Sequence, residues 1–184
     1  MNLEDVRKEL DQVDLEFKEL FLKRMEIAKR IAKVKAESGD DIYKPDRETE
    51  VIEKLTDGVA PEFKSEYVAF LRRLMQLSRE IQYAERLKIN DDFFLEDSGI
   101  ASPSHNRLKV RFACPDRCGA LMNTISIIAD YGINITDIRM AWEATDLIIY
   151  LELAANMLDE NIKALLVQLY AETEGLKMIG SYQK

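Results

Sequence analysis

The chain has 184 residues, of which 47% are hydrophobic and 33% charged, which is typical of a globular protein with one domain or two small ones. Its net charge of −8 argues against nucleic acid and anionic membranes as partners, and no stretch is long and apolar enough to span a membrane. The N-terminal stretch is acidic and amphipathic, unlike a secretory signal, so we expect a cytoplasmic protein.

Histidine and cysteine are scarce, which argues against most histidine-based and metal-based chemistry. His105 is the single histidine, and we expect it in a polar linker. Cys114 and Cys118 are separated by three residues, and no neighbouring residue completes a metal site around them. We therefore expect free thiols, no metal and no cofactor.

The first predicted element is a helix from Leu3 to about Ser38, with no proline or glycine inside it. Asn2 can cap its start and Gly39 can end it. At about 1.5 Å per residue the helix would be roughly 50 Å long, longer than a domain of this size is wide, so we expect it to pair with a second copy in a homodimer. The pairing seam has two heptad columns, Leu3, Leu10, Phe17, Arg24 and Ile31, and Val6, Val13, Leu20, Ile27 and Val34.

Arg24 interrupts this apolar seam with a charge that should point inward. A buried arginine is costly without an anionic partner, which either the protein or a ligand can supply. Lys35, eleven residues later, returns to almost the same face, because eleven steps of about 100° overshoot three turns by roughly 20°. Two cations on one face favour a ligand, with a salt bridge inside the protein as the alternative. Arg7 lies about 25 Å from Arg24 along the helix, so it could join this region only from the partner of an antiparallel dimer.

A second, shorter helix is predicted from Pro45, which suits a first helical turn, to the Asp57-Gly58 pair. Glu48 heads a stripe of this helix that is otherwise apolar. A glutamate in a first turn is either a partner of the helix dipole or a contact to a ligand. The other members of the stripe are Ile52, Leu55 and Val59.

A third helix is expected over about residues 65–88, and one of its faces changes from apolar to hydrogen-bonding along its length. Leu71 and Met75 come first, followed by Ser78 and Gln82. Ser78 and Gln82 are four residues apart and therefore neighbours on the face. They either mark a polar boundary between helices or belong to a site.

The second half of the chain has a different pattern. Residues 91–106 lose periodicity and are predicted to link a helical domain, 1–90, to a second domain, 107–184. In the second domain, strands and helices alternate in the order β-α-β-β-α-β, which predicts an α+β ferredoxin-like unit with a four-stranded antiparallel sheet. The expected strands are 108–113, 134–142, 147–153 and 176–182, and the expected helices are 120–131 and 157–174.

About residues 3–88 resemble the all-helical, AroQ-type chorismate mutases. The resemblance implies an all-α three-helix domain that forms an intertwined homodimer. It also implies an enzyme that rearranges chorismate to prephenate in phenylalanine and tyrosine biosynthesis. The motifs that carry it are Arg7, Val13-Asp14, Lys23-Arg24-Met25-Glu26-Ile27-Ala28, Lys33-Val34-Lys35, Pro45-Asp46-Arg47-Glu48, and Ser78 with Gln82.

The same resemblance assigns four residues to the substrate's carboxylates. Arg24, and Arg7 from the partner subunit, would bind the carboxylates of chorismate. Arg47 and Ser78 would support the carboxylate on the ring. Arg24 counts among the catalytic residues, because it would also hold the reacting dianion in place.

Three further residues would act at the reacting part of the molecule. By resemblance, Lys35 and Gln82 would donate hydrogen bonds to the ether oxygen, and Glu48 would accept a hydrogen bond from the ring hydroxyl. Family members often carry an acidic residue where this chain has Lys44, a departure that bears on hydroxyl recognition and turnover.

Residues 107–184 resemble an ACT domain, a module that binds small effectors, often amino acids. The motifs are Asp116-Arg117-Cys118-Gly119-Ala120-Leu121 and Gly132-Ile133-Asn134-Ile135. Residues 139–142, Arg-Met-Ala-Trp, stand where phenylalanine-responsive dehydratases carry Glu-Ser-Arg-Pro, so phenylalanine is in doubt as the effector and the unit could serve only to dimerise. The implied effector-binding residues are Asp116, Gly119, Ala120, Leu121 and Asn134.

The sequence thus predicts a homodimeric chorismate mutase with an ACT-like regulatory domain, an aromatic amino acid as a possible effector, and no nucleic acid or membrane partner. Isochorismate pyruvate lyase is an alternative with the same helical fold, although Glu48, placed for the ring hydroxyl of chorismate, argues against it. A non-catalytic protein that binds an amino acid and regulates a partner enzyme is the other alternative. The charges expected to point inward argue against this second alternative, because they are costly to bury and a protein without a catalytic site would have no reason to keep them.

Overall fold

A computed structural model describes residues 2–90, 104–114, 119–143 and 146–184. We call residues 2–90 the helical unit and residues 104–184 the C-terminal unit. Most of the expected linker, as well as Asp116 and Cys118, lies outside the described residues. Within the described ranges, no helix is long and apolar enough to cross a membrane.

The helical unit consists of α1 (Leu3–Ser38), α2 (Pro45–Thr56), a short 3-10 turn η1 (Pro61–Phe63) and α3 (Lys64–Ile89). The predicted caps of α1 are confirmed, since Asn2 Oδ1 accepts a hydrogen bond from the Asp5 amide at 2.9 Å and Gly39 has φ 71°. A positive φ of this size suits glycine, which has no Cβ. The three predicted helices are therefore all present, with ends within two residues of the expected ones.

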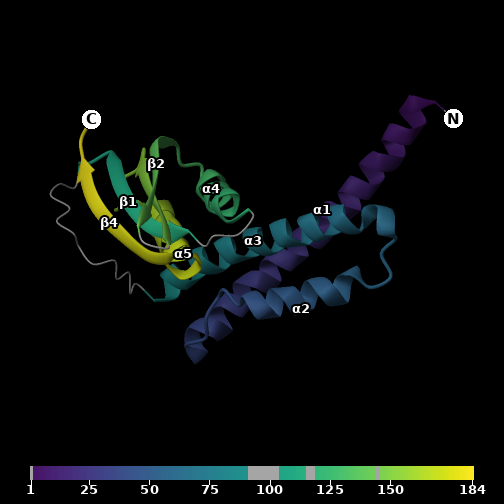
Figure 1. Ribbon diagram of the computed structural model, residues 1–184. Helices are drawn as coiled ribbons and strands as arrows, with labels where there is room; N and C mark the ends of the chain where they lie inside the picture. Colours follow the sequence, from purple (N-terminus) through teal and green to yellow (C-terminus); the bar gives the residue numbers. More distant parts are fainter. Residues whose placement is uncertain (1, 91–103, 115–118, 144–145) are drawn as a thin grey trace.

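Helix α1 packs across α3, and α2 packs along the same helix (Figure 1). The N-terminal part of α1 projects beyond the other helices (Figure 1). Only Met25, Ala28 and Ala32 of α1 are buried, whereas the apolar members of the predicted seam are exposed or nearly so. Leu10 is 58% exposed and Leu20 64%. Most of the seam's apolar surface is therefore left uncovered by the protein's own α3, although the Phe17 ring lies 5.6 Å from that of Phe70.

In its described residues, the C-terminal unit has four strands and two helices in the predicted order. Its sheet has the strand order β2-β3-β1-β4 with antiparallel pairs, which confirms the ferredoxin-like topology. Its elements are β1 (Arg107–Cys114), α4 (Ala120–Asp130), β2 (Ile135–Glu143), β3 (Asp146–Leu153), α5 (Glu160–Glu172) and β4 (Glu174–Tyr182).

The start of α5 differs from the prediction by three residues. Asn156 closes a turn there, because its side chain accepts from the Leu158 amide at 2.9 Å and its carbonyl accepts from the Asp159 amide at 3.1 Å. Asparagine often bonds its own backbone in this way, in competition with helix formation. The helix therefore begins at Glu160, after the turn.

The core of the C-terminal unit lies between one face of the sheet and helices α4 and α5. Alternate residues of β1 and β3 are fully buried, as expected for a sheet covered on one face. Leu108, Phe112 and Ile149 from the sheet and Leu165 and Leu169 from α5 are all 0% exposed. This one contiguous cluster holds most of the buried apolar side chains of the described residues.

His105 falls within the expected linker, residues 91–106, but the expectation of polar surroundings for it was wrong. Its side chain is 1% exposed, and Nε2 accepts a hydrogen bond from the Met157 amide at 3.0 Å. The ring thereby ties the segment before β1 to the turn before α5. It acts as a satisfied core residue.

Candidate active site

Arg24 points from α1 toward α3, as the seam pattern predicted. Its Nη1 donates to the Leu74 carbonyl at 3.2 Å and to Ser78 Oγ. Burial lowers the pKa of Arg24, and the negative charge of Glu48 acts in the opposite direction. The guanidinium has five N–H groups, so two bonds leave donors free for an anion.

Lys35 lies near the end of α1, where the chain turns toward α2. Its Nζ donates to the carbonyls of Asp41 at 2.7 Å and Ile42 at 2.9 Å. Partial burial lowers the pKa of Lys35, while the nearby carboxylates of Asp40, Asp41 and Glu48 oppose this effect. An ammonium group has three N–H donors, so one remains for a ligand.

Gln82 and Ser78 form a buried polar pair on α3. Both are at most 7% exposed, and Gln82 Nε2 donates to the Ser78 carbonyl at 3.2 Å. Gln82 Oε1 is buried without a hydrogen-bond partner in the described part of the chain. A buried, unsatisfied amide oxygen is costly in a core, but it is common where a ligand completes the site.

Glu48 heads α2 and bonds to a residue that the sequence analysis did not name. Its Oε1 accepts from Nη1 of Arg79, whose side chain is only 11% exposed. Arg79 follows Ser78 directly in α3. Its second partner, Glu172, is 93 residues further along the chain, so no local sequence pattern could predict the contact.

Arg24 of α1 and the pair Ser78 and Gln82 of α3 are thus linked by hydrogen bonds. The carboxylate of Glu48 in α2 lies close enough to act on the pKa of both Arg24 and Lys35. The structure does not bring Arg7 or Arg47 to these residues. Arg7 is exposed on α1, and the Arg47 side chain, 69% exposed, pairs with Glu50 at 2.9 Å.

Lys44, the residue that departs from the family pattern, stands at the N-cap of α2. Its Nζ pairs with Asp40 at 2.6 Å, and the side chain caps no backbone amide of α2. The lysine is nearly half exposed. Its side chain therefore serves the turn between α1 and α2 and does not bond to the candidate site residues.

Four of the five expected effector-binding residues lie in the described residues. Gly119 caps α4 with φ 84°, Ala120 is buried, Leu121 is half-buried and Asn134 is exposed. Gly119 and Ala120 line a cleft of about 880 Å³ between α2, α3 and α4, which Glu48 and Arg79 also reach. No side chain from Leu121 or Asn134 lines this cleft.

A second hollow of about 510 Å³ lies on the exposed face of α1. The seam residues Ile27, Ile31 and Val34 line it, together with Lys35. The face on which a second copy is expected therefore reaches one of the candidate catalytic cations. No group of histidine, cysteine and carboxylate side chains within the described residues could hold a metal ion.

Inward cations, a carboxylate and amides on the helices of one unit are groups suited to an anionic small molecule. Residues 6–83 match the family model of chorismate mutase type II.

Two curated relatives carry the same similarity over a short stretch. The bifunctional chorismate mutase/prephenate dehydratase of Aquifex aeolicus is 40% identical over 53 residues, which cover 29% of this chain and 15% of that protein. The T-protein of Haemophilus influenzae is 41% identical over 51 residues, 28% of this chain and 14% of that protein. The chain thus matches about a seventh of the length of these relatives.

Among solved structures, a prephenate dehydratase from Arthrobacter aurescens in complex with L-Phe is 19% identical and covers 46% of this chain and 29% of that one, with a TM-score of 0.43. The quorum-quenching acylase GqqA is 16% identical and covers 46% of this chain and 32% of that one, with a TM-score of 0.42. The fold of the C-terminal unit rests on its own topology rather than on similarities of this size.

Proposed function

We propose that this protein is a chorismate mutase, which rearranges chorismate to prephenate for phenylalanine and tyrosine biosynthesis. The observation that carries the proposal is the polar interior of the helical unit, built within residues 6–83 from Arg24, Lys35, Glu48 and Gln82. A cytoplasmic location belongs to the proposal on the grounds of composition.

The rearrangement needs no nucleophile and no proton transfer. It needs the flexible side arm of chorismate held over the ring and charge stabilised at the breaking ether bond. The free donors of Arg24 suit a carboxylate, with Ser78 beside it. Lys35 and the second N–H of Gln82 suit the ether oxygen, and Glu48 suits the ring hydroxyl. Arg47, which is exposed on α2 and pairs with Glu50, would have to exchange that partner for the ring carboxylate to complete the proposed binding.

A homodimer is part of the proposal. The exposed seam of α1 supports it, because full burial of each valine, leucine, isoleucine or phenylalanine side chain would contribute about 1.5–3 kcal/mol. In an antiparallel pair, Arg7 of the partner subunit would approach the Arg24 region. The seam hollow beside Lys35 supports the same arrangement.

The domain division is also proposed, with a catalytic domain at 1–90, a linker at 91–106 and a regulatory domain at 107–184. An amino acid effector would bind near the start of α4, where backbone amides can meet a carboxylate. The proposed contacts are Gly119, Ala120 and Leu121, together with Asp116 and Asn134.

The test is to follow chorismate loss with the purified protein, to identify the product, and to add phenylalanine, tyrosine or tryptophan in turn. Prephenate formation that responds to one of them would support both halves of the proposal. Prephenate without any response would leave the C-terminal unit a structural role. Pyruvate from isochorismate would point to a lyase, and no turnover would favour a regulatory protein.

The site itself is tested by Arg24→Ala and Lys35→Ala. We expect each to lower kcat/KM by at least about 100-fold, because each removes a cation from the developing charge. Lys23→Ala removes an exposed cation next to Arg24 and serves as the matched control, with an expected change below about twofold. Substantial activity in a folded Arg24→Ala or Lys35→Ala protein would refute the assignment.

A further inference from the structure

Arg79 joins three parts of the molecule. Its Nη1 donates to Glu48 of α2, while Nε and Nη2 donate to the two oxygens of Glu172 in α5 at 2.8 and 3.0 Å. Its guanidinium also lies over the Tyr43 ring, 4.8 Å from the centroid. A guanidinium is planar and offers donors in a rigid fork, so contacts on two edges and one face fix its orientation.

Glu172 is a buried carboxylate that the C-terminal unit contributes to this contact. Its side chain is 6% exposed, and burial raises its pKa while the bonds from Arg79 oppose the rise. Gln168 Nε2 donates to Glu172 Oε1 at 3.0 Å, and the Tyr131 hydroxyl donates to Gln168 Oε1 at 3.0 Å. A continuous set of hydrogen bonds therefore runs from α2 through α3 and α5 to the end of α4.

The charges in this contact are unequal, with two carboxylates around one cation. A merely structural pair would need only one carboxylate, and a buried charge is costly unless it is bonded. Because Glu172 holds Nε and Nη2 of Arg79, the remaining nitrogen, Nη1, is aimed at Glu48. The Glu48 side chain remains 26% exposed, so it can still accept a further bond.

We propose that Arg79 is a positioning residue for Glu48 and that the C-terminal unit completes the active site by supplying Glu172, which holds Arg79 in place. This inference rests on the proposed function, in which Glu48 accepts the ring hydroxyl of chorismate. Any displacement of α5 relative to α3 would then shift Arg79 and, with it, the carboxylate that holds the substrate.

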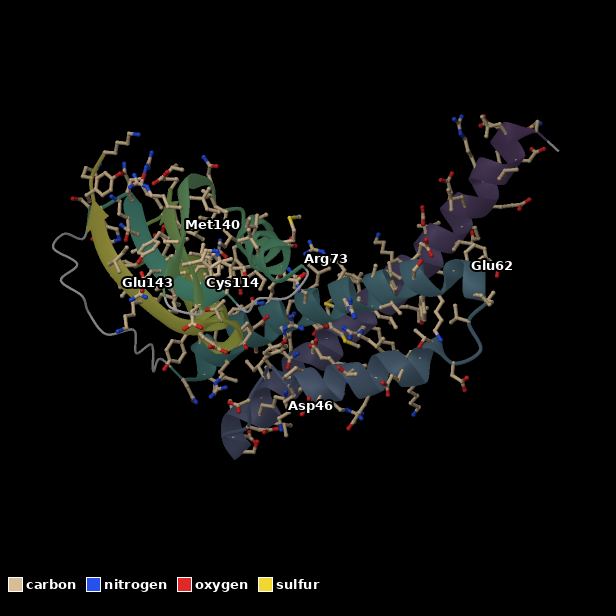
Figure 2. The ribbon with its side chains drawn as sticks, viewed as in Figure 1. Asp46, Glu62, Arg73, Cys114, Met140 and Glu143 are labelled. Atoms are coloured by element: carbon tan, nitrogen blue, oxygen red, sulfur yellow. The ribbon has the colours of Figure 1, made fainter. Side chains whose placement is uncertain are left out.

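A second contact between the two units provides a matched control. Arg73 of α3 lies at the junction with α4 (Figure 2), where it pairs with Asp130 through two bonds. Gln76 Nε2 donates to the same carboxylate at 2.9 Å. This contact joins the same units through charged groups of α3, but it has no bond to Glu48.

The experiment compares Glu172→Gln with Asp130→Asn in the full-length protein, using steady-state kinetics of prephenate formation. No bond to the ring hydroxyl forms or breaks in the rearrangement. Loss of its hydrogen bond to Glu48 therefore weakens binding of the ground state and of the transition state alike, and the effect appears in KM. We expect Glu172→Gln to raise KM about tenfold with kcat within about twofold, and Asp130→Asn to change neither by more than about twofold.

A chorismate analogue with hydrogen in place of the ring hydroxyl sharpens the test. With this substrate, wild type and Glu172→Gln should have the same KM to within about twofold, because the analogue has no hydroxyl to donate a hydrogen bond to Glu48. If Glu172→Gln does not fold, Arg79→Lys takes its place. It keeps one cation but cannot hold both carboxylates in fixed geometry, and it should give the same rise in KM.

Three results would overturn the positioning role. An unchanged KM for chorismate in folded Glu172→Gln or Arg79→Lys is one, and an equal rise with the analogue is another. A fall in kcat at constant KM in both Glu172→Gln and Asp130→Asn is the third, since it reports only a loosened fold. A wild-type protein that makes no prephenate would refute the proposed function itself, and the positioning role with it.

Discussion

The two units of this protein differ in how many of their apolar side chains they bury. The C-terminal unit closes a core of its own, in which Phe112, Ile149 and Leu165 are wholly buried. The helical unit, of similar length, buries few apolar side chains and leaves a line of large ones exposed along α1. Its interior between the helices mixes apolar side chains with polar ones, among them Ser78, Gln82 and half-buried Arg24.

This difference indicates where each unit obtains its stability and what each is built to do. A sheet with two helices on one face is stable by itself once its apolar face is covered. Three helices that surround charged and amide groups lack such a core and need another apolar contact. The exposed seam is the surface best suited to provide it, which links dimerisation to the candidate site in the same unit.

The largest effect should come from a charge in the seam. Leu10→Glu places a carboxylate among apolar side chains of the proposed pair of α1 helices, and burial of an unpaired charge is expensive. We expect loss of the dimer in analytical ultracentrifugation and at least about a 100-fold fall in kcat/KM, because Arg7 of the partner would be lost from the site.

Gln12→Glu is the control for this variant. Residue 12 is exposed on α1 but lies outside both seam columns, so the same charge is added next to the seam rather than in it. A dimeric and active Leu10→Glu protein would show that the seam has another purpose. If both variants lost the dimer and the activity to the same extent, the effect would be due to net charge.

A pair of identical truncations compares the two units directly. Leu165 is 0% exposed and Leu20 is 64% exposed. Leu165→Ala should lower the free energy of unfolding by about 3 kcal/mol at any protein concentration, as large cavities in cores do. Leu20→Ala should lower the denaturation midpoint only at concentrations where the wild type is dimeric. Urea unfolding at two concentrations decides this, and a concentration-independent loss in Leu20→Ala would contradict the comparison.

Most of the fold could be predicted because its signals are local and strongly periodic. Five heptads without a breaker define α1, and the alternation of β1 and β3 fixes which face of the sheet is covered. The predictions for His105 and for the start of α5 failed because in each case a single side chain determines the local structure. His105 has polar neighbours in sequence but a buried place in the fold, and Asn156 delays the start of α5 by closing a turn.

The candidate site could be predicted only in part, for a similar reason. Arg24 and Lys35 stand out because they interrupt one apolar face at helical spacing. Arg79 interrupts no such pattern, and its partners Glu48 and Glu172 come from a different helix and a different unit. Contacts between units leave no periodic trace in the sequence, so the coupling of the two halves becomes visible only in three dimensions.

A smaller effect is expected when the site's amide is made ionisable. Gln82 is 7% exposed, and we expect flat activity around neutral pH in the wild type. In Gln82→Glu, the new carboxyl must be protonated to donate to the ether oxygen, and burial raises its pKa. Activity should then rise as the pH falls, by up to about tenfold per unit while the pH stays above the pKa of the new carboxyl, and level off below it. A flat pH profile of kcat/KM in this variant would contradict the assigned role, and the unchanged profile of Lys23→Ala controls for pH effects on the fold.

The smallest effect concerns the contact between α3 and α4, where the two units meet. Burial, followed by a hydrogen bond to Asp130, raises the pKa of Glu80 from 4.5 to about 8. Burial alone would also raise the pKa of Asp130, but bonds from Arg73 and Glu80 bring it below its ordinary value. Between pH 4.5 and 8 the folded protein therefore holds a proton on Glu80 that the unfolded chain has lost, and stability should fall as the pH rises through this range.

Glu80→Gln removes this titration, because an amide stays neutral at every pH in the range. We expect the variant to lose less stability than the wild type between pH 5 and 8. The difference should reach no more than about 1 kcal/mol, since the side chain is only partly buried and water screens it. Thermal unfolding at several pH values measures the effect, with exposed Glu62→Gln as the control. If wild type and Glu80→Gln lost stability in parallel, the proton would not reside on Glu80. The contact between α3 and α4 would then be held by the bonds from Arg73 and Gln76 to Asp130, independently of pH in this range.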